Sequence, residues 1–145
     1  MKPDSRPTAR ELNTRNLLRR CVHYSVVNGD LCGAGVRPDR WPFGHRPCCH
    51  GGLTSSDYQA CEQFRALTAE EVNAILDEWD QRHRQTATAR AAIEAAAGPF
   101  KRGVASEGAI ACPVCEKGRL GYRRSEFNGH IMAACSTETC VRWME

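Results

Sequence analysis

Two cysteine pairs close to the end of the chain decide its fold: Cys112-Pro113-Val114-Cys115 and Cys135-Ser136-Thr137-Glu138-Thr139-Cys140. Each pair lies in one short turn, which brings two thiolates close together. Zn²⁺ prefers four tetrahedral donors, and a site made of four thiolates is structural, because a catalytic zinc keeps one position open. The spacing therefore predicts a structural zinc site with four ligands, Cys112, Cys115, Cys135 and Cys140.

The segment between the two pairs predicts a β-hairpin. Residues 120–124 can form one strand and residues 130–134 the return strand, and Asn128-Gly129 is the dipeptide that a two-residue type I′ turn prefers. Residues 141–144 add a short third strand. This is the pattern of a zinc ribbon. Because so short a segment buries little apolar surface, we expect the metal to supply the missing stabilisation.

The same stretch resembles the C-terminal ribbon of small cysteine-rich proteins encoded by tailed bacteriophages and prophages. In the C-terminal part the shared features are the first cysteine turn, Phe127-Asn128-Gly129-His130 and Cys140-Val141-Arg142-Trp143. In the N-terminal part they are Cys21-Val22-His23-Tyr24, Cys32-Gly33-Ala34-Gly35-Val36, Pro47-Cys48 and Cys61. Glu116 departs from that group, in which a glycine often follows the first turn. The resemblance implies a phage-type origin and a ribbon fold, and it implies no activity, because the group is mostly uncharacterised.

A second group of cysteines lies within residues 21–65, among glycines and prolines that predict a loop-rich fold held by cross-links. Two kinds of metal site are compatible with it: a second structural Zn²⁺, which we favour, or a [4Fe–4S] cluster. Free thiols are the third alternative. Adjacent side chains point apart, so one of Cys48 and Cys49 binds the ion, and we favour Cys48. The predicted ligands are Cys21, Cys32, Cys48 and Cys61, with Cys49 or His50 as substitutes.

Two helices are predicted from capping boxes, one formed by Thr8 with Glu11 and one by Thr68 with Glu71. The first should run to about residue 20, and the second from residue 69 to about residue 97, before Gly98-Pro99. The apolar stripe of the long helix is lost after residue 79, so we expect the helix to leave the core there. The alanines of residues 91–97 then offer a contact for a homodimer.

The expected fold class is α+β, small and stabilised by metal. The expected segments are a helix with a cysteine-rich metal module in residues 1–67, a long helix in residues 68–98, a linker in residues 99–111 and the zinc ribbon in residues 112–145. With 7% aromatic residues and a mean hydropathy of −0.52, the chain has little apolar material for a core. Nine cysteines and five histidines offset that shortage.

Localisation and charge narrow the function classes. Without a signal peptide or a long apolar run, we expect a cytoplasmic protein, in the bacterial host cell if it is phage-encoded, with no membrane partner. Cysteines in that compartment favour metal over disulfides. The net charge of +3 is divided unevenly, with +4 in residues 1–20, 0 in residues 21–67, −3 in residues 68–100 and +2 in residues 101–145. An anionic partner for the basic ends and plain solvation are both compatible with this asymmetry.

The favoured function is a nucleic-acid-associated or regulatory metal-binding module without catalysis. Arg123 and Arg124 are neighbours on a strand and must point to opposite faces, so only part of the ribbon's arginines, Arg142 included, can form one patch. The candidate contact residues are Arg119, Tyr122, Arg123 and Arg124 in the ribbon, Arg15, Arg19 and Arg20 in the first helix, and Trp41. Trp41 can instead cover the metal loops. The alternatives are a protein that binds or inhibits a host enzyme or defence complex, and an iron–sulfur or thiol redox protein.

Overall fold

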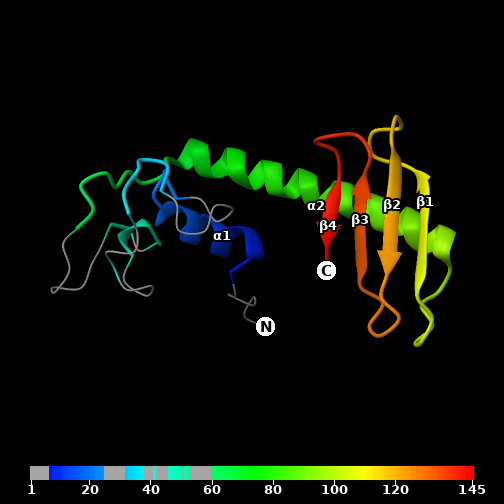
Figure 1. Ribbon diagram of the computed structural model, residues 1–145. Coiled ribbons are helices and arrows are strands. Elements are labelled where there is room, and N and C mark those ends of the chain that lie inside the picture. Colours follow the sequence, from blue (N-terminus) through cyan, green and yellow to red (C-terminus); the bar gives the residue numbers. More distant parts are fainter. Residues whose placement is uncertain (1–6, 25–31, 38–40, 42–45, 50, 53–59) are drawn as a thin grey trace, which may run out of the picture. The chain divides into compact units, whose positions relative to one another are not determined.

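The structure is a computed structural model of the chain (Figure 1). It describes residues 7–24, 32–37, 41, 46–49, 51–52 and 60–145. The chain divides into two compact units, Met1–Asp77 and Glu78–Glu145, and the division falls inside the long helix α2 (Ala69–Ala97). The described elements are helices and one four-stranded antiparallel sheet, which confirms the α+β class. The division differs from the four expected segments, because the second part of α2 belongs to the same unit as the sheet.

The N-terminal unit begins with the short helix α1 (Ala9–Leu18), which is capped as predicted. The Glu11 amide donates to the Thr8 hydroxyl at 3.2 Å, and the Thr8 amide donates to the Glu11 carboxylate at 2.6 Å. Arg10 on α1 forms an ion pair of 2.9 Å with Asp77 on α2. The buried apolar side chains that the two helices contribute to this unit are Leu17, Val72 and Leu76.

Between the two helices of the N-terminal unit, the described residues include a short 3-10 helix, η3 (Pro47–Cys49). The described residues of this unit form two isolated bridges. The bridges pair Cys21 with Ala66 and Tyr24 with Cys32. Helix α2 starts at the predicted capping box, in which the Thr68 amide donates to the Glu71 carboxylate at 2.8 Å and the Glu71 amide donates to the Thr68 hydroxyl at 3.2 Å.

The C-terminal unit contains the sheet, whose strands follow one another in sequence order (Figure 1). The strands are β1 (Ser106–Ala111), β2 (Arg119–Arg124), β3 (Ile131–Cys135) and β4 (Arg142–Met144). The last three confirm the expected strands, but β1 lies in the segment expected to be a linker. Its small residues carry no apolar alternation. It forms an edge strand in which Gly108 lies opposite Tyr122, and a Cβ at Gly108 would come within 2.9 Å of the Tyr122 hydroxyl.

The connection between β2 and β3 is longer than the expected two-residue turn. The Ser125 amide donates to the His130 carbonyl at 2.9 Å, and the Gly129 amide donates to the Ser125 carbonyl at 3.1 Å. A type I′ turn needs positive φ at both central residues, whereas in this loop only Gly129 has it, at +75°. Asn128 acts through its side chain, which accepts a hydrogen bond from the His130 amide at 3.1 Å.

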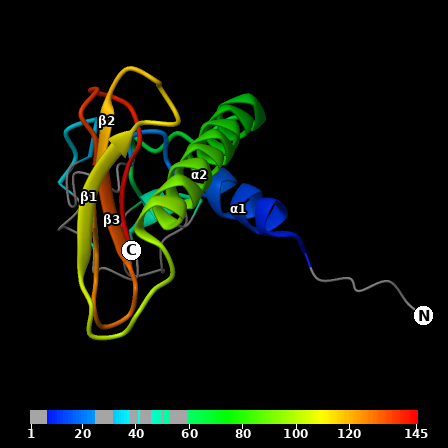
Figure 2. The ribbon, with the colours of Figure 1, turned by 90° about the vertical axis from the view of Figure 1, so that its right-hand side faces the viewer.

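Helix α2 packs against one face of the sheet, contrary to the expectation that it leaves the core (Figure 2). Ala89 and Ile93 are fully buried, one helical turn apart, and lie in one apolar cluster with residues of the sheet and its connections. These residues are Cys112, Leu120, Ile131, Ala133 and Val141. The apolar periodicity of this part of α2 is weak, because the helix contributes only a narrow stripe to the cluster. The sheet and its connections supply most of the side-chain volume of the cluster.

Arg124 joins the end of α2 to the sheet. Its side chain is only 5% exposed, and its guanidinium donates to the carbonyls of Gly98 at 2.8 Å and Ala97 at 3.3 Å and to the Ser106 hydroxyl at 3.1 Å. The last carbonyls of a helix lack partners within the helix, and positive charge is favourable there. These contacts give Arg124 a structural role, and its guanidinium is buried within its own chain instead of being presented to a partner.

Candidate metal centre

The first cysteine turn is closed by backbone hydrogen bonds around Cys112. The Glu116 amide donates to the Cys112 carbonyl at 3.0 Å, and the Cys112 amide donates to the Gly118 carbonyl at 2.9 Å. Glu116 adopts a left-handed conformation with φ of +56°, which is the position where the resembling group often has glycine. This geometry folds the chain back so that Cys112 and Cys115 present their sulfur atoms to the same side.

The second cysteine turn is built in a related way between β3 and β4. The Cys135 amide donates to the Val141 carbonyl at 3.0 Å, and the Cys140 amide donates to the Thr137 carbonyl at 3.2 Å. Thr139, immediately before Cys140, has φ of +64°. Because a β-branched residue is rarely found in this region, the turn is under local backbone strain. An ion bound by both Cys135 and Cys140 would offset this strain.

The four sulfur atoms of the two turns form a tetra-cysteine cluster. The Sγ atoms of Cys112 and Cys140 are 3.7 Å apart, as are those of Cys115 and Cys135, and all four lie within 4.8 Å of one another. A tetrahedral ion with Zn–S bonds of about 2.3 Å sets its sulfur atoms about 3.8 Å apart. All nine cysteines of the chain are free thiols. The cluster could therefore hold a metal ion such as zinc, on the four residues that the sequence predicts.

The protein environment shifts the pKa values of two of these thiols in opposite directions. The pKa of Cys115 is lowered to about 6, first by the Thr137 hydroxyl, which lies 3.5 Å from its sulfur, and then by the amides of Lys117 and Gly118. Burial raises the pKa of Cys140 to about 12. A metal ion must displace the proton of Cys140, whereas Cys115 offers a thiolate near neutral pH. The contribution of Thr137 was not predicted from the sequence, because cysteine spacing carries no information about hydroxyl donors.

Gly118 allows the two turns to approach each other. A Cβ at this position would lie 2.5 Å from the Thr137 hydroxyl oxygen and 2.6 Å from the Cys135 sulfur. Real side-chain atoms do not approach this closely, so any other residue would push the second turn away from the first. The close approach of the two turns therefore requires glycine at this position.

The cysteines predicted to form the second site lie in the N-terminal unit without forming a comparable cluster. Within the described residues, the C-terminal cysteines are the only group whose ligand atoms all lie within 4.8 Å. The predicted ligands nevertheless line one small cavity, whose lining includes Cys21, Cys32, Cys48 and Cys61. Burial, and after it the adjacent Cys49, raise the pKa of Cys48 to about 12. His50, a predicted substitute, lies outside the described residues.

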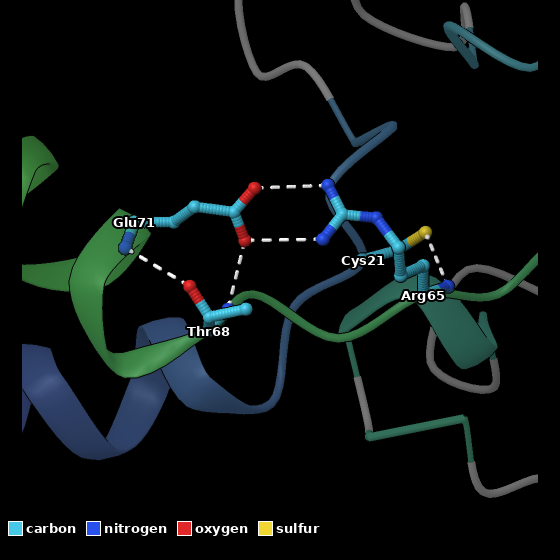
Figure 3. A network of polar contacts seen from close by, with 4 residues as sticks. All are labelled: Cys21, Arg65, Thr68 and Glu71. Atoms are coloured by element: carbon cyan, nitrogen blue, oxygen red, sulfur yellow. Dashed lines mark hydrogen bonds and ion pairs between the residues drawn. The ribbon is translucent and has the colours of Figure 1, made fainter.

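One of these cysteines belongs to a polar network that reaches helix α2 (Figure 3). The Arg65 amide donates to the Cys21 sulfur at 3.4 Å. The Arg65 guanidinium donates to both carboxylate oxygens of Glu71, at 2.9 and 3.1 Å. Together with the Thr68 amide, this pairing lowers the pKa of Glu71 to about 2. The network fixes the segment that follows Cys61 against the start of α2.

The predicted contact residues of the sheet are divided between its two faces. Side chains alternate along a strand, and Leu120 and Ile131 define the face that α2 covers. Tyr122 is on that covered face, where it is partly buried and packs against the core. The opposite face, which we call the open face, carries Glu107, Ala109, Ala111, Arg119, Gly121, Arg123, Met132, Ala134, Arg142 and Met144. Its three arginines are exposed.

The predicted contact residues of the N-terminal unit differ in exposure. Arg15 and Arg19 are exposed on or next to α1. Arg20 is partly buried, with its guanidinium carbon 5.7 Å from the centre of the Tyr24 ring. Trp41 is 5% exposed and lines the cysteine cavity, which agrees with a covering role and not with contact to a partner.

Comparisons with known proteins return no relative: no family model, no curated protein and no solved structure matches the chain. A separate test for membrane spans finds no described helix that is both long and apolar enough to cross a bilayer.

Proposed function

We propose that the C-terminal unit is a zinc-stabilised ribbon whose open face binds nucleic acid. The observation that carries the proposal is the arrangement of Arg119, Arg123 and Arg142, which are exposed on one sheet face while the opposite face is filled by α2. Arginine side chains bind phosphate with two parallel hydrogen bonds, and a sheet holds them at fixed spacing. The zinc ion keeps this sheet folded and takes no part in binding.

The surface between the arginines suits an extended, weakly specific contact. Gly121 on β2 and Ala134 on β3 lie opposite each other. Because both residues are small, the middle of the open face forms a shallow groove of about 650 Å³. Met132 and Met144, 51% and 75% exposed, lie beside Arg123 and offer apolar surface to bases or sugars. Glu107 lies opposite Arg123 and reduces the charge of the face from +3 to +2. The expected affinity is therefore modest.

The proposal is tested by binding of fluorescent single- and double-stranded DNA and RNA to the zinc-loaded full chain, titrated from low to physiological salt. Three phosphate contacts predict a slope of log K against log salt of about −2.7 for duplex DNA and about −2.1 for single strands. The double variant Arg123→Gln, Arg142→Gln should bind more weakly and reduce the slope by about 2.

Arg82→Gln is the matched control for one lost charge, because Arg82 is exposed on α2 and pairs with Glu78 at 2.5 Å. It should change neither affinity nor slope measurably. The proposal fails if the wild-type protein does not bind at low salt, or if the double variant binds as the control does. Either result would direct the search to a protein partner for the open face, which is the alternative function.

A further inference from the structure

The N-terminal unit brings four cysteines from four separate segments of the chain around one small cavity. Cys21 follows α1, Cys32 is paired with Tyr24 by a bridge, Cys48 lies in η3, and Cys61 precedes the network of Arg65. All four line the same cavity, which is closed mainly by apolar side chains, with Trp41 and Phe64 among them. Cysteines so far apart in sequence do not meet in this way through local turn geometry alone.

Backbone hydrogen bonds hold these segments next to one another. The Cys21 amide donates to the Cys48 carbonyl at 2.8 Å, which fixes the end of α1 against η3. The Gly33 amide donates to the His23 carbonyl at 2.9 Å and holds Cys32 beside the residues that follow Cys21. The proximity of the segments that carry Cys21, Cys32 and Cys48 is therefore part of the folded backbone.

We infer that these four cysteines form a second metal site, which binds a single Zn²⁺ through Cys21, Cys32, Cys48 and Cys61. Four thiolates suit zinc and other soft divalent ions. The amide of Arg65, 3.4 Å from the Cys21 sulfur, supplies the kind of hydrogen bond that stabilises a metal-bound thiolate from outside the coordination shell. This inference is independent of the proposed role of the open face.

The size of the cavity favours a single ion over an iron–sulfur cluster. Its volume is about 30 Å³. A cavity of about 10 to 15 Å³, measured with a water-sized probe, holds one water molecule, so this one has room for about two or three such spheres. A [4Fe–4S] cube, with eight atoms, needs far more space than this cavity offers.

The structure also selects Cys48 over its neighbour. Cys49 has its sulfur 4.0 Å from that of Cys48, yet it does not line the cavity. Its thiol interacts with the Tyr24 hydroxyl instead, and this interaction raises the pKa of Tyr24. Cys49 is therefore a matched control for Cys48, with the same chemistry one residue away.

The two sites should fill in order. The C-terminal thiols already have the spacing that a zinc ion requires, whereas the N-terminal thiols must draw together around the ion. The N-terminal site should therefore bind zinc more weakly than the C-terminal cluster, because a preorganised site loses less conformational freedom on binding. The first equivalent of zinc should therefore occupy the ribbon and the second the N-terminal unit.

The test uses the full chain, with zinc content measured after gel filtration and with iodoacetamide alkylation read by peptide mass spectrometry. With two equivalents of zinc, the wild-type protein should hold two ions, with Cys49 alkylated and the other eight cysteines protected. With one equivalent, protection should be confined to the C-terminal cysteines. Cys49→Ser should keep two ions, Cys48→Ser should keep one, and Cys112→Ser should keep the ion of the N-terminal unit.

A wild-type zinc content of one, with all five N-terminal cysteines alkylated, would overturn the inference even if the substituted proteins fail to fold. Equal zinc loss in Cys48→Ser and Cys49→Ser would overturn the assignment of ligands. Protein purified with bound iron and visible absorption would replace the single ion by a cluster. None of these outcomes bears on nucleic-acid binding by the open face.

Discussion

Glu116 and Thr139 hold left-handed backbone conformations next to metal ligands, one in each cysteine turn. For a residue with a Cβ this conformation costs about 1–2 kcal/mol, and glycine avoids the cost but loses about 0.5–1 kcal/mol through the flexibility of the unfolded chain. Both turns therefore contain stored strain. Cysteine spacing predicted which four residues form the cluster, but it could not show that the backbone between them is strained.

Replacing either strained residue by glycine should stabilise the metal-bound protein. We expect Thr139→Gly and Glu116→Gly each to raise the free energy of unfolding by about 0.5–1 kcal/mol, measured by denaturant titration of zinc-loaded protein. Glu138→Gly is the control, because Glu138 is exposed and lacks a positive φ, so glycine there should only destabilise. Equal effects at positions 138 and 139 would mean that strain at Thr139 is not released by glycine.

Glu71 should remain ionised at pH values where an ordinary glutamate is protonated. Its pKa is lowered from 4.5 to about 2, first by Arg65 and then by the Thr68 amide. Because the folded-state pKa lies below the unfolded one, the stabilisation is complete above pH 4.5 and is lost as the pH falls from there towards 2. The Thr68 amide reports on this in NMR, since it donates to the Glu71 carboxylate.

The expected NMR result is a Thr68 amide shift that stays constant from pH 7 to pH 4 in the wild-type protein. Arg65→Gln removes the main cause of the lowered pKa while the Thr68 hydrogen bond remains, so the same amide should titrate at a higher pH than in the wild-type protein, though still below 4.5. Arg82→Gln, which changes an unrelated ion pair, should leave the amide unaffected. A pH-dependent shift of the Thr68 amide above pH 4 in the wild-type protein would contradict the pairing of Glu71 with Arg65.

At the level of elements, local signals were predicted well and packing was not. Both capping boxes are formed, because each depends on hydrogen bonds between residues three apart. Strand β1 was missed because its small residues show no alternation, and its stability depends on Tyr122 of the neighbouring strand. The contact of α2 with the sheet was missed because a stripe of Ala89 and Ile93 is too short to stand out in a sequence.

The ribbon should depend on α2 as well as on its metal. Ile93 is fully buried against the sheet, so Ile93→Ala should destabilise the C-terminal unit by about 2–4 kcal/mol while all four ligands remain. Denaturant unfolding of the zinc-loaded protein measures the change. Ala95→Ser, at an exposed position of the same helix, should stay within about 0.5 kcal/mol of wild type. Similar small effects at both positions would show that the metal alone holds the sheet.

Packing of α2 on the sheet also limits how a homodimer could form. Ile93 lies within the segment that was expected to offer a homodimer contact, but it is covered by the sheet of its own chain. A homodimer through this helix would have to use the exposed positions of residues 91–97, and it stays a prediction.

At the level of the whole molecule, the two units should lose structure separately. Cys135→Ser removes one ligand of the C-terminal cluster and should release its ion. Because the small sheet depends on the ion, hydrogen exchange should increase across residues 106–145 and residues 89–97. Protection near Val72 and Leu76 should persist, since those side chains are buried in the N-terminal unit. Loss of protection at Val72 together with the sheet would mean that the chain unfolds as one unit.

The assignment of one sheet face to α2 and the other to solvent implies an alternating pattern of mutational tolerance along β2. Even-numbered positions, Leu120, Tyr122 and Arg124, contact the core or the helix end, so substitutions there should lower the amount of folded protein. At the odd-numbered Arg119 and Arg123, folding should tolerate many residues while binding does not. A library of β2 substitutions, scored separately for the amount of folded protein and for binding, should therefore show losses of folded protein at even-numbered positions and losses of binding at odd-numbered positions.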